Sequence, residues 1–545
     1  MRSADPPAGP PRTTLGLDLM NSIVKSEGTF HEGRGSWLAS ARRGFLGFVF
    51  DLMNLYQDED LHPSYYDLFS RVQYEIRPGH RVSAHLLHAG DETNGVEADG
   101  TDYRMRYSNS YAWLNWEADF SRDLGVRTVA SLGRVAQHRA GSDPFGQGIL
   151  DTLRVDDQDA STLLGLRQDW QLRVSPRMML KWGFDLMAGS ADYDYYRADF
   201  VWVPNLTDPQ GPDFWPRRDT LRVAVSRSGA QAGAYLATRF RPSDALTVEP
   251  GLRFDHQSYT AEHQISPRIQ AALQLTPATT LRGAWGYYSQ PQALNELSAA
   301  DADTTFYPAQ RAEHRVLAVD RRFGSGLTVR IEAYERLLSN PLPEYRRVSR
   351  NTGPLWEESL VDRIFVQPER GRAEGVELLV KSPAGRSLTW SGSYALSEVE
   401  EEISGEWVPR PFDQRHAVNL QVAFRPTSEW SFAAGWIYHS PWPFTEVKYG
   451  LEQTVGGEPV AFRYTDVLNQ KRLPPYMRLD LRVSREFKLN RGDLLVYADV
   501  FNALMRDNAL DMQQSARWVH GRWKFQESVY PQMPMLPSVG ARWTF

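Results

Sequence analysis

Short runs in which apolar and polar residues alternate recur along the whole chain, roughly twenty times. In the run 479–484, three aliphatic residues alternate with Asp480, Arg482 and Ser484. The same period recurs at 246–249, 252–255, 327–332 and 418–422. A period of two predicts β-strands with two chemically different faces. This number of strands is more than an open twisted sheet readily accommodates.

The connections between these runs are of two kinds. Short turns are predicted at 77–80, 121–125, 174–177, 241–244, 276–279, 323–326, 382–385, 425–428 and 489–492. Longer connections are predicted at 191–228, 290–310, 340–369, 400–412, 442–472 and 504–535. Short periplasmic turns at one end and long extracellular loops at the other are typical of outer-membrane barrels. The sequence therefore predicts an all-β protein, a transmembrane antiparallel β-barrel, and disfavours a soluble sandwich.

The cost of charge in lipid assigns the two faces of each strand. A charged side chain that faces lipid at mid-bilayer costs roughly 2–4 kcal/mol. The charged members of the alternating runs are therefore expected to face the lumen: Arg253, Arg330, Glu332, Arg478, Asp480 and Arg482. A barrel of this size encloses a polar lumen that side chains alone do not fill.

Composition excludes several other classes of protein. Mean hydropathy is -0.49, and the longest nearly apolar run, 44–56, is shorter than the roughly 20 residues of a spanning helix. Aromatic residues make up 12% of the chain, which is expected if two interfacial girdles ring a barrel. The chain has no cysteine, so disulfides and thiolate metal sites are excluded. The net charge of -6 is spread along the chain, with no basic stripe for nucleic acid.

No motif in the chain predicts catalysis, a cofactor or a metal site. Zinc-hydrolase, P-loop, nucleophile-elbow and EF-hand patterns are absent from the sequence. The acidic run 398–402 could hold a divalent cation or lie in solvent, and solvent is favoured. We therefore expect that the protein is not an enzyme.

Aromatic residues are concentrated in the predicted outer loops. Aromatic side chains with scattered Arg and Asp are what a receptor uses to hold a ligand. The candidate ligand-binding residues are Tyr193, Tyr195, Trp202, Trp215, Trp356 and Trp442. For any one of them, a place in an interfacial girdle or in loop packing is the favoured alternative, so only the set suggests a binding vestibule.

The last nine residues alternate up to a terminal aromatic side chain. Trp543 lies on the apolar face of this segment, and Phe545 ends the chain. A last strand that ends in a free aromatic resembles the signal read by the barrel-assembly machinery, which is therefore an expected partner.

Five segments, in order, resemble the TonB-dependent receptor family. The segment 473–481, LPPYMRLDL, resembles the family's strand opening LPPYxRLDL. Further similarities lie at 35–43, 371–378, 412–419 and 496–504. Each segment alone is weak, but five in order are strong, and the resemblance covers roughly residues 13–545, up to the terminal phenylalanine.

The resemblance implies a barrel of 22 strands in the bacterial outer membrane, in contact with lipid and lipopolysaccharide. It also implies an N-terminal plug that pairs with TonB and moves aside when ligand is imported. The chain departs from this pattern at its start, where residues 1–12 form a Pro-rich lead, expected to be disordered, without the apolar core of a signal peptide. We therefore expect 13–545 to be the barrel, its first strand short or missing, and the plug, through which TonB would act, to be absent by N-terminal truncation.

The sequence leaves three functions open. The leading hypothesis is the barrel of a receptor for ligand uptake. The alternatives are a passive porin-like pore formed by an unplugged barrel, and a soluble all-β enzyme or adhesin. The ligand cannot be deduced from the sequence, because siderophore, cobalamin, oligosaccharide and peptide receptors share this barrel.

Overall fold

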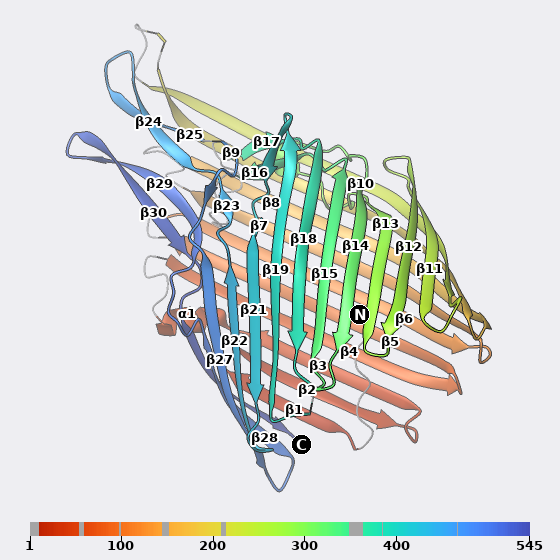
Figure 1. Cartoon of the computed structure of the whole chain (residues 1–545). Helices are drawn as coiled ribbons and strands as arrows, with labels where there is room; N and C mark the ends of the chain where they lie inside the picture. The colour runs from red at the N-terminus through yellow and green to blue at the C-terminus, as the bar shows by residue number, and fades with distance from the viewer. Residues whose placement is uncertain are drawn as a thin grey trace.

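The structure is a computed structural model that describes residues 10–545, except 54–58, 98–99, 144–151, 206, 209–213, 348–362, 384 and 466. Its main sheet has 23 strands, of which β20 (Glu406–Pro409) pairs with β19 alone. The other 22 form one closed antiparallel ring, the predicted barrel (Figure 1). No described helix is long and apolar enough to cross a membrane.

The first half of the ring consists of β1 (Arg12–Asp18), β2 (Asn21–Phe30), β3 (Gly35–Gly44), β4 (Glu59–Arg77), β5 (His80–Glu97), β6 (Asp102–Asp119), β7 (Leu124–Asp143), β8 (Thr152–Ser175), β9 (Met178–Pro204), β10 (Phe214–Phe240) and β11 (Leu246–Gln257). The second half consists of β12 (Glu262–Thr276), β13 (Thr279–Gln290), β14 (Gln310–Arg322), β15 (Thr328–Ser339), β18 (Arg370–Lys381), β19 (Leu388–Ile403), β21 (His416–Phe424), β22 (Trp430–His439), β27 (Tyr476–Lys488), β28 (Asp493–Phe501) and β31 (Leu536–Thr544).

The ring closes between the first and last strands. Thr14 lies opposite Thr544 and Asp18 opposite Gly540, and Phe545 exchanges backbone hydrogen bonds of 2.8 and 2.9 Å with Thr13. Closure pairs the backbone N–H and C=O groups of the two edge strands, which lipid could not hydrogen-bond. The first strand, which the sequence leaves short or missing, is present with 7 residues. It begins at Arg12, one residue before the expected boundary, and residues 1–9 lie outside the described part of the chain.

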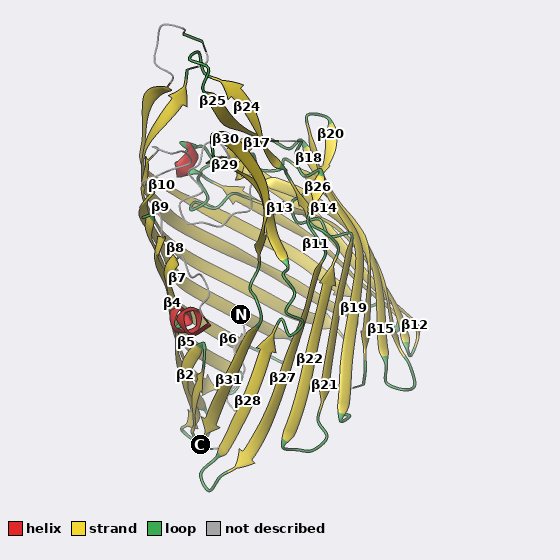
Figure 2. Cartoon of the chain, turned by 90° about the vertical axis from the view of Figure 1, so that its left-hand side faces the viewer, coloured by secondary structure: helices red, strands yellow, loops and turns green. Residues whose placement is uncertain are grey.

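All nine predicted short turns join consecutive strands at one rim of the barrel. The long connections lie at the other rim and carry small elements of their own (Figure 2). These elements are α1 (Leu46–Met53), η1 (Ala299–Asp301), β16 (Glu344–Arg347), β17 (Arg363–Val366), β23 (Pro443–Phe444), β24 (Val447–Gln453), β25 (Pro459–Thr465), β26 (Lys471–Arg472), β29 (Ala509–Val519) and β30 (Arg522–Pro531).

One predicted loop was wrong. Most of 191–228 is strand, because β9 and β10 stay paired from Met178↔Phe240 up to Pro204↔Phe214. These two strands of 27 residues exceed the 9–11 residues needed to cross a membrane at a typical tilt. The hairpin therefore projects beyond the outer rim as a continuation of the wall.

The two faces of the strands separate as predicted. On β11, Leu252 and Phe254 are exposed on the outer face, whereas Arg253 pairs with carboxylates on the inner face. Near the short turns, Phe120, Trp170 and Trp182 stack in sequence with ring centroids 5.9 and 5.8 Å apart. Such a row of outward aromatic rings is typical of a membrane interface.

Gly492, in the turn between β27 and β28, supports a first prediction. Its φ is +80°, and an added Cβ would lie 1.9 Å from the carbonyl oxygen of Thr544 on the closing strand. We expect Gly492→Ala to destabilise the barrel by more than the roughly 1–2 kcal/mol of a left-handed backbone alone. The readout is the temperature at which the folded band disappears in heat-modifiability gels.

Gly405→Ala is the control for this prediction, because Gly405 has a φ of +79° but no atom within 4 Å of its added Cβ. Equal losses in the two variants would show that contact with the closing strand is not limiting.

Candidate functional site: the lumen and its outer mouth

Ion pairs line much of the lumen. Arg253 on β11 reaches Asp185 on β9 at 2.9 Å and Asp255 at 2.6 Å. Farther toward the short turns, Lys181 pairs with Glu249 at 2.7 Å. The Arg253–Asp185 and Lys181–Glu249 pairs bridge β9 and β11 across the intervening β10.

The other charged residues predicted to face the lumen are also paired. Arg330 contacts Glu332 at 2.8 Å, and Arg478 contacts Asp480 at 2.9 Å. Arg482 reaches Asp499 on the next strand at 3.3 Å. The alternation in sequence thus places each of these groups where a partner is available.

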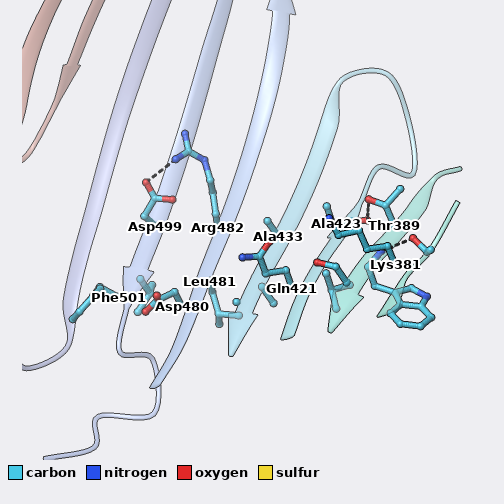
Figure 3. A pocket seen from close by; sticks show the side chains of 17 residues that line it. Lys381, Thr389, Gln421, Ala423, Ala433, Asp480, Leu481, Arg482, Asp499 and Phe501 are labelled. Carbon is cyan, nitrogen blue, oxygen red and sulfur yellow. Dashed lines mark hydrogen bonds and ion pairs between the residues drawn. The ribbon is translucent and has the colours of Figure 1, made fainter. Parts of the chain in front are cut away.

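A hollow of about 840 Å³ lies on the lumen wall across β18, β19, β21, β22, β27 and β28. Its floor is made of small and neutral residues, among them Gln421, Ala433 and Gly435. Figure 3 shows the Arg482–Asp499 pair on one side of this hollow and Lys381 on the other. The wall here offers neutral hydrogen-bonding groups between two charged margins.

The connection between β13 and β14, residues 291–309, is held against the inner wall by Tyr193. The Tyr193 hydroxyl donates to the Leu294 carbonyl oxygen at 2.7 Å and accepts from the Leu297 N–H at 3.2 Å. Tyr259 adds a hydrogen bond of 2.6 Å to the Gln292 carbonyl oxygen. The outer mouth is therefore narrowed by a connection that hydrogen bonds fasten to the wall.

Tyr193 and Tyr195 are buried in the cluster beneath this connection. Their side chains are 4% and 0% exposed, against Val155, Leu294 and Leu297. In this arrangement they hold the connection, and a ligand would reach them only after it moved.

Charged residues of β7 and β8 lie beside this cluster. The outer face of β8 is polar at this level, with Asp156 and Gln158, and we therefore place this part of the wall above the membrane. Arg139 pairs with Asp157 at 2.9 Å, both side chains being nearly buried. Burial, with repulsion from Asp157, raises the pKa of Asp159 to about 7. Burial also raises the pKa of Tyr193 to about 12, so its hydroxyl keeps the proton that it donates.

The connection between β15 and β18 is fastened to the mouth by a buried ion pair. Arg346 on β16 binds Glu401 on β19 through both guanidinium NH₂ groups, with Nη2 to Oε2 at 2.7 Å. The two side chains are 11% and 3% exposed. Arg410 lies 3.7 Å from the same carboxylate.

The sequence reading missed Glu401, which it treated as one member of the acidic run 398–402. The other three glutamates of the run face outward and pair with arginines: Glu398 with Arg415, Glu400 with Arg372, and Glu402 with Arg370. Glu401 has the opposite strand parity to the other three glutamates and therefore faces inward. This difference in parity is the sequence feature from which its inward position could have been predicted.

The remaining candidate residues are dispersed. Trp442 packs on His439, with ring centroids 4.5 Å apart, beside the small cluster around Leu473. Trp215 is exposed near the tip of the β9–β10 hairpin, Trp202 lies on β9, and Trp356 lies outside the described residues. Trp543 donates its Nε1–H to the Arg491 carbonyl oxygen at 2.9 Å and lies 4.2 Å from the Phe545 ring, at the seam of the barrel.

Removal of the Tyr193 hydroxyl supports a second prediction. Tyr193→Phe leaves a buried N–H and a buried carbonyl oxygen of the 291–309 connection without partners, at about 1–3 kcal/mol. We expect faster hydrogen exchange at Leu294 and Leu297, with the barrel strands unchanged. Tyr196→Phe, on the opposite face of β9, is the control. Unchanged exchange in Tyr193→Phe would contradict the assigned role.

A closed sheet with an apolar outer face, a polar lumen, short turns at one rim and elaborate loops at the other defines a transmembrane β-barrel of the outer membrane. Residues 32–503 match the model of the TonB-dependent receptor-like β-barrel, and the chain belongs to this family. It is therefore an outer-membrane transport protein and not an enzyme.

Solved structures of the same architecture cover nearly the whole chain. The Ferric-Catecholate import receptor Fiu from K12 E. coli is 13% identical with a TM-score of 0.67, over 100% of this chain and 83% of that one. The ferric citrate transporter FecA is 14% identical with a TM-score of 0.63, over 100% and 79%. The copper transporter OprC is 11% identical with a TM-score of 0.67, over 99% and 81%. No curated protein sequence matches the chain. At these identities the likeness establishes the fold.

Proposed function

We propose that this chain forms the wall and outer mouth of a receptor that imports a small metal chelate, with energy delivered through TonB. Membership of the family and a mouth narrowed by fastened connections support this function over open diffusion. The observation that carries the proposal is the pair of inward connections, one held by Tyr193 and the other by the Arg346–Glu401 pair. A plug, as the family resemblance implies, would be the part that contacts TonB.

The proposed ligand class comes from the solved neighbours, whose names specify ferric citrate, ferric catecholate and copper. A chelate of this kind is small and polar, and the lumen offers it both paired charges and a neutral hollow. Of the candidate aromatics described at the mouth, Trp215 is exposed at the hairpin tip and Trp442 is half-buried. We propose these two as the first ligand contacts to test.

Uptake in whole cells tests the proposal. The protein is expressed together with the plug that the family resemblance implies, in cells without their own ferric receptors, and entry of radiolabelled ferric citrate and a ferric catecholate is measured with and without TonB. We expect uptake of one chelate that stops when TonB is deleted or the proton gradient is collapsed. Equal uptake without TonB would support the passive porin-like pore instead. Trp215→Ala and Trp442→Ala are expected to weaken uptake relative to Trp390→Ala on the lipid-facing side of β19.

A further inference from the structure

A groove of about 890 Å³ runs over the outer surface of the barrel, across β2 to β8. Its ridges are the aliphatic side chains Val24, Leu68, Leu86 and Leu132, which are 47–59% exposed. Between the ridges the strands carry small side chains, namely Ala39, Ala41, Ser70 and Ala112. The groove therefore lies within the apolar belt and has room for a hydrocarbon chain between its ridges.

Strand parity places the groove on the lipid side. Leu132 on β7 has the same parity as Leu164, its neighbour on β8, whereas Arg127 and Arg139 have the opposite parity and face inward. On β5, Leu86 likewise alternates with His85, which stacks on the lumen-facing Trp113 at 4.6 Å. Lipid, and not a solute in the lumen, covers this groove.

A polar row crosses the end of the groove that is farther from the short turns. His88, Ser110, Arg134 and Thr162 lie directly opposite one another on β5, β6, β7 and β8. The Tyr66 hydroxyl lies 3.0 Å from His88 Nε2, and Ser110 Oγ lies 2.9 Å from His88 Nδ1. These hydrogen bonds fix the imidazole in the row, two strands away from Arg134.

Arg134 is exposed on this lipid side, and no described residue supplies a carboxylate to it. It is eight residues above Val126, which sits among the aromatic residues of the lower girdle. At the rise of a tilted strand this places it roughly 19 Å above that girdle, within the upper part of the ~25 Å apolar band. A guanidinium at this depth is stabilised by an anion that reaches it from the membrane.

The wall above the polar row is recessed and basic. Gly90, Ser108 and Ala136 occupy the next outward positions on β5, β6 and β7. Arg43 on β3 lies at one side of this recess, and Arg106, bound to Glu92 at 3.2 Å, lies above it. The small side chains thus leave space for a lipid headgroup, and Arg43 and Arg106 place positive charge at the border of this space.

We propose that this surface binds one phosphorylated, acylated lipid of the outer leaflet. An acyl chain occupies the groove between Val24, Leu68 and Leu132, and a headgroup phosphate pairs with Arg134 in the polar row that also contains His88 and Ser110. Phosphate accepts the bidentate hydrogen bonds that guanidinium donates, and water is excluded on the membrane side.

On the opposite side of the barrel, two outward arginines have carboxylate partners: Arg315 pairs with Glu335 at 2.7 Å, and Arg372 pairs with Glu400 at 2.8 Å. Arg315 therefore serves as the matched control for Arg134, as it is outward, exposed and paired.

Lipid retention by the purified protein tests the proposal. Native mass spectrometry counts lipids bound to the wild type, Arg134→Gln and Arg315→Gln after titration with deep-rough lipopolysaccharide. We expect Arg134→Gln to bind at least about tenfold more weakly, the value of one charge-assisted contact, and Arg315→Gln to bind like the wild type. Equal affinity in Arg134→Gln, or an equal loss in both variants, would overturn the proposal.

Two further arms separate the headgroup from the chain. Dephosphorylated lipopolysaccharide should bind weakly. Millimolar inorganic phosphate should not displace the intact lipid; if it did, the site would be one for free anions, and the proposal of a lipid site would be overturned. Ala112→Phe, which fills the groove, should weaken binding, whereas Ala434→Phe on the outer face of β22 should not. Heat-modifiable migration establishes that each variant is folded, and Arg134→Lys, which keeps the charge, should retain part of the affinity.

Discussion

Replacement of Glu401 by alanine is expected to free the β16–β17 hairpin from the barrel mouth while the barrel stays closed. The substitution leaves the Arg346 guanidinium, which is 11% exposed, without its partner. Removing one member of a buried ion pair costs roughly 3–5 kcal/mol, because the remaining charge is buried without compensation. Most of this cost is expected to appear locally, since the hairpin can leave the wall without opening the ring.

Hydrogen exchange measures this effect. Amides of Glu344–Arg347 should exchange about a hundredfold faster or more in Glu401→Ala, while those of β19 and β21 should not change. Glu402→Ala is the matched control, because Glu402 is the next residue but faces outward to Arg370, whose side chain is 61% exposed. An exposed pair is worth about 1 kcal/mol or less, so this control should behave like the wild type. Similar exchange in both variants would contradict the assigned role.

The second large effect is expected when a charge is placed on the lipid-facing side of a strand, and not when it is placed on the lumen side of the same strand. Leu420 lies at the middle of β21 and is 44% exposed on the lipid side, whereas its neighbour Gln421 lines the lumen hollow. Leu420→Arg should destabilise the barrel by roughly 2–4 kcal/mol, because the guanidinium faces hydrocarbon near the bilayer midplane. Gln421→Arg should be tolerated, because the lumen is polar.

Urea titration of the refolded barrel in lipid vesicles gives the two free energies of unfolding. Leu420→Asn separates the cost of charge from the loss of the leucine side chain. If Gln421→Arg destabilised as much as Leu420→Arg, the assignment of the two faces would be wrong.

Much of the wall could be predicted from the sequence, because its signals are local. The alternation of Leu479, Leu481 and Val483 with charged residues determines strand, face and environment within six positions. Turn residues determine the nine short turns for the same reason. The reading failed where a polar hairpin continued the wall: the tyrosines and aspartates of 191–196 resemble a loop in composition, but they alternate and pair across to β10.

The candidate site was less predictable. Aromatic content led to Tyr193 and Tyr195, but not to the connection that buries them, because Leu294 is 101 residues away from Tyr193. Glu401 was similarly separated from Arg346 by 55 residues. Neither separation leaves a trace in composition or period, since a buried contact depends on how a loop folds back and not on its own pattern.

The sequence by itself determined that the chain forms membrane-spanning strands, which face of each strand meets lipid, and where the short turns lie. It could do so because the cost of charge in lipid and the period of a strand act residue by residue. Only the tertiary structure decided that β1 meets β31, that two outer connections fold inward, and that Arg134 is left facing the membrane without a carboxylate among the described residues. These features depend on the curvature and register of the whole ring, which bring together side chains that no local pattern connects.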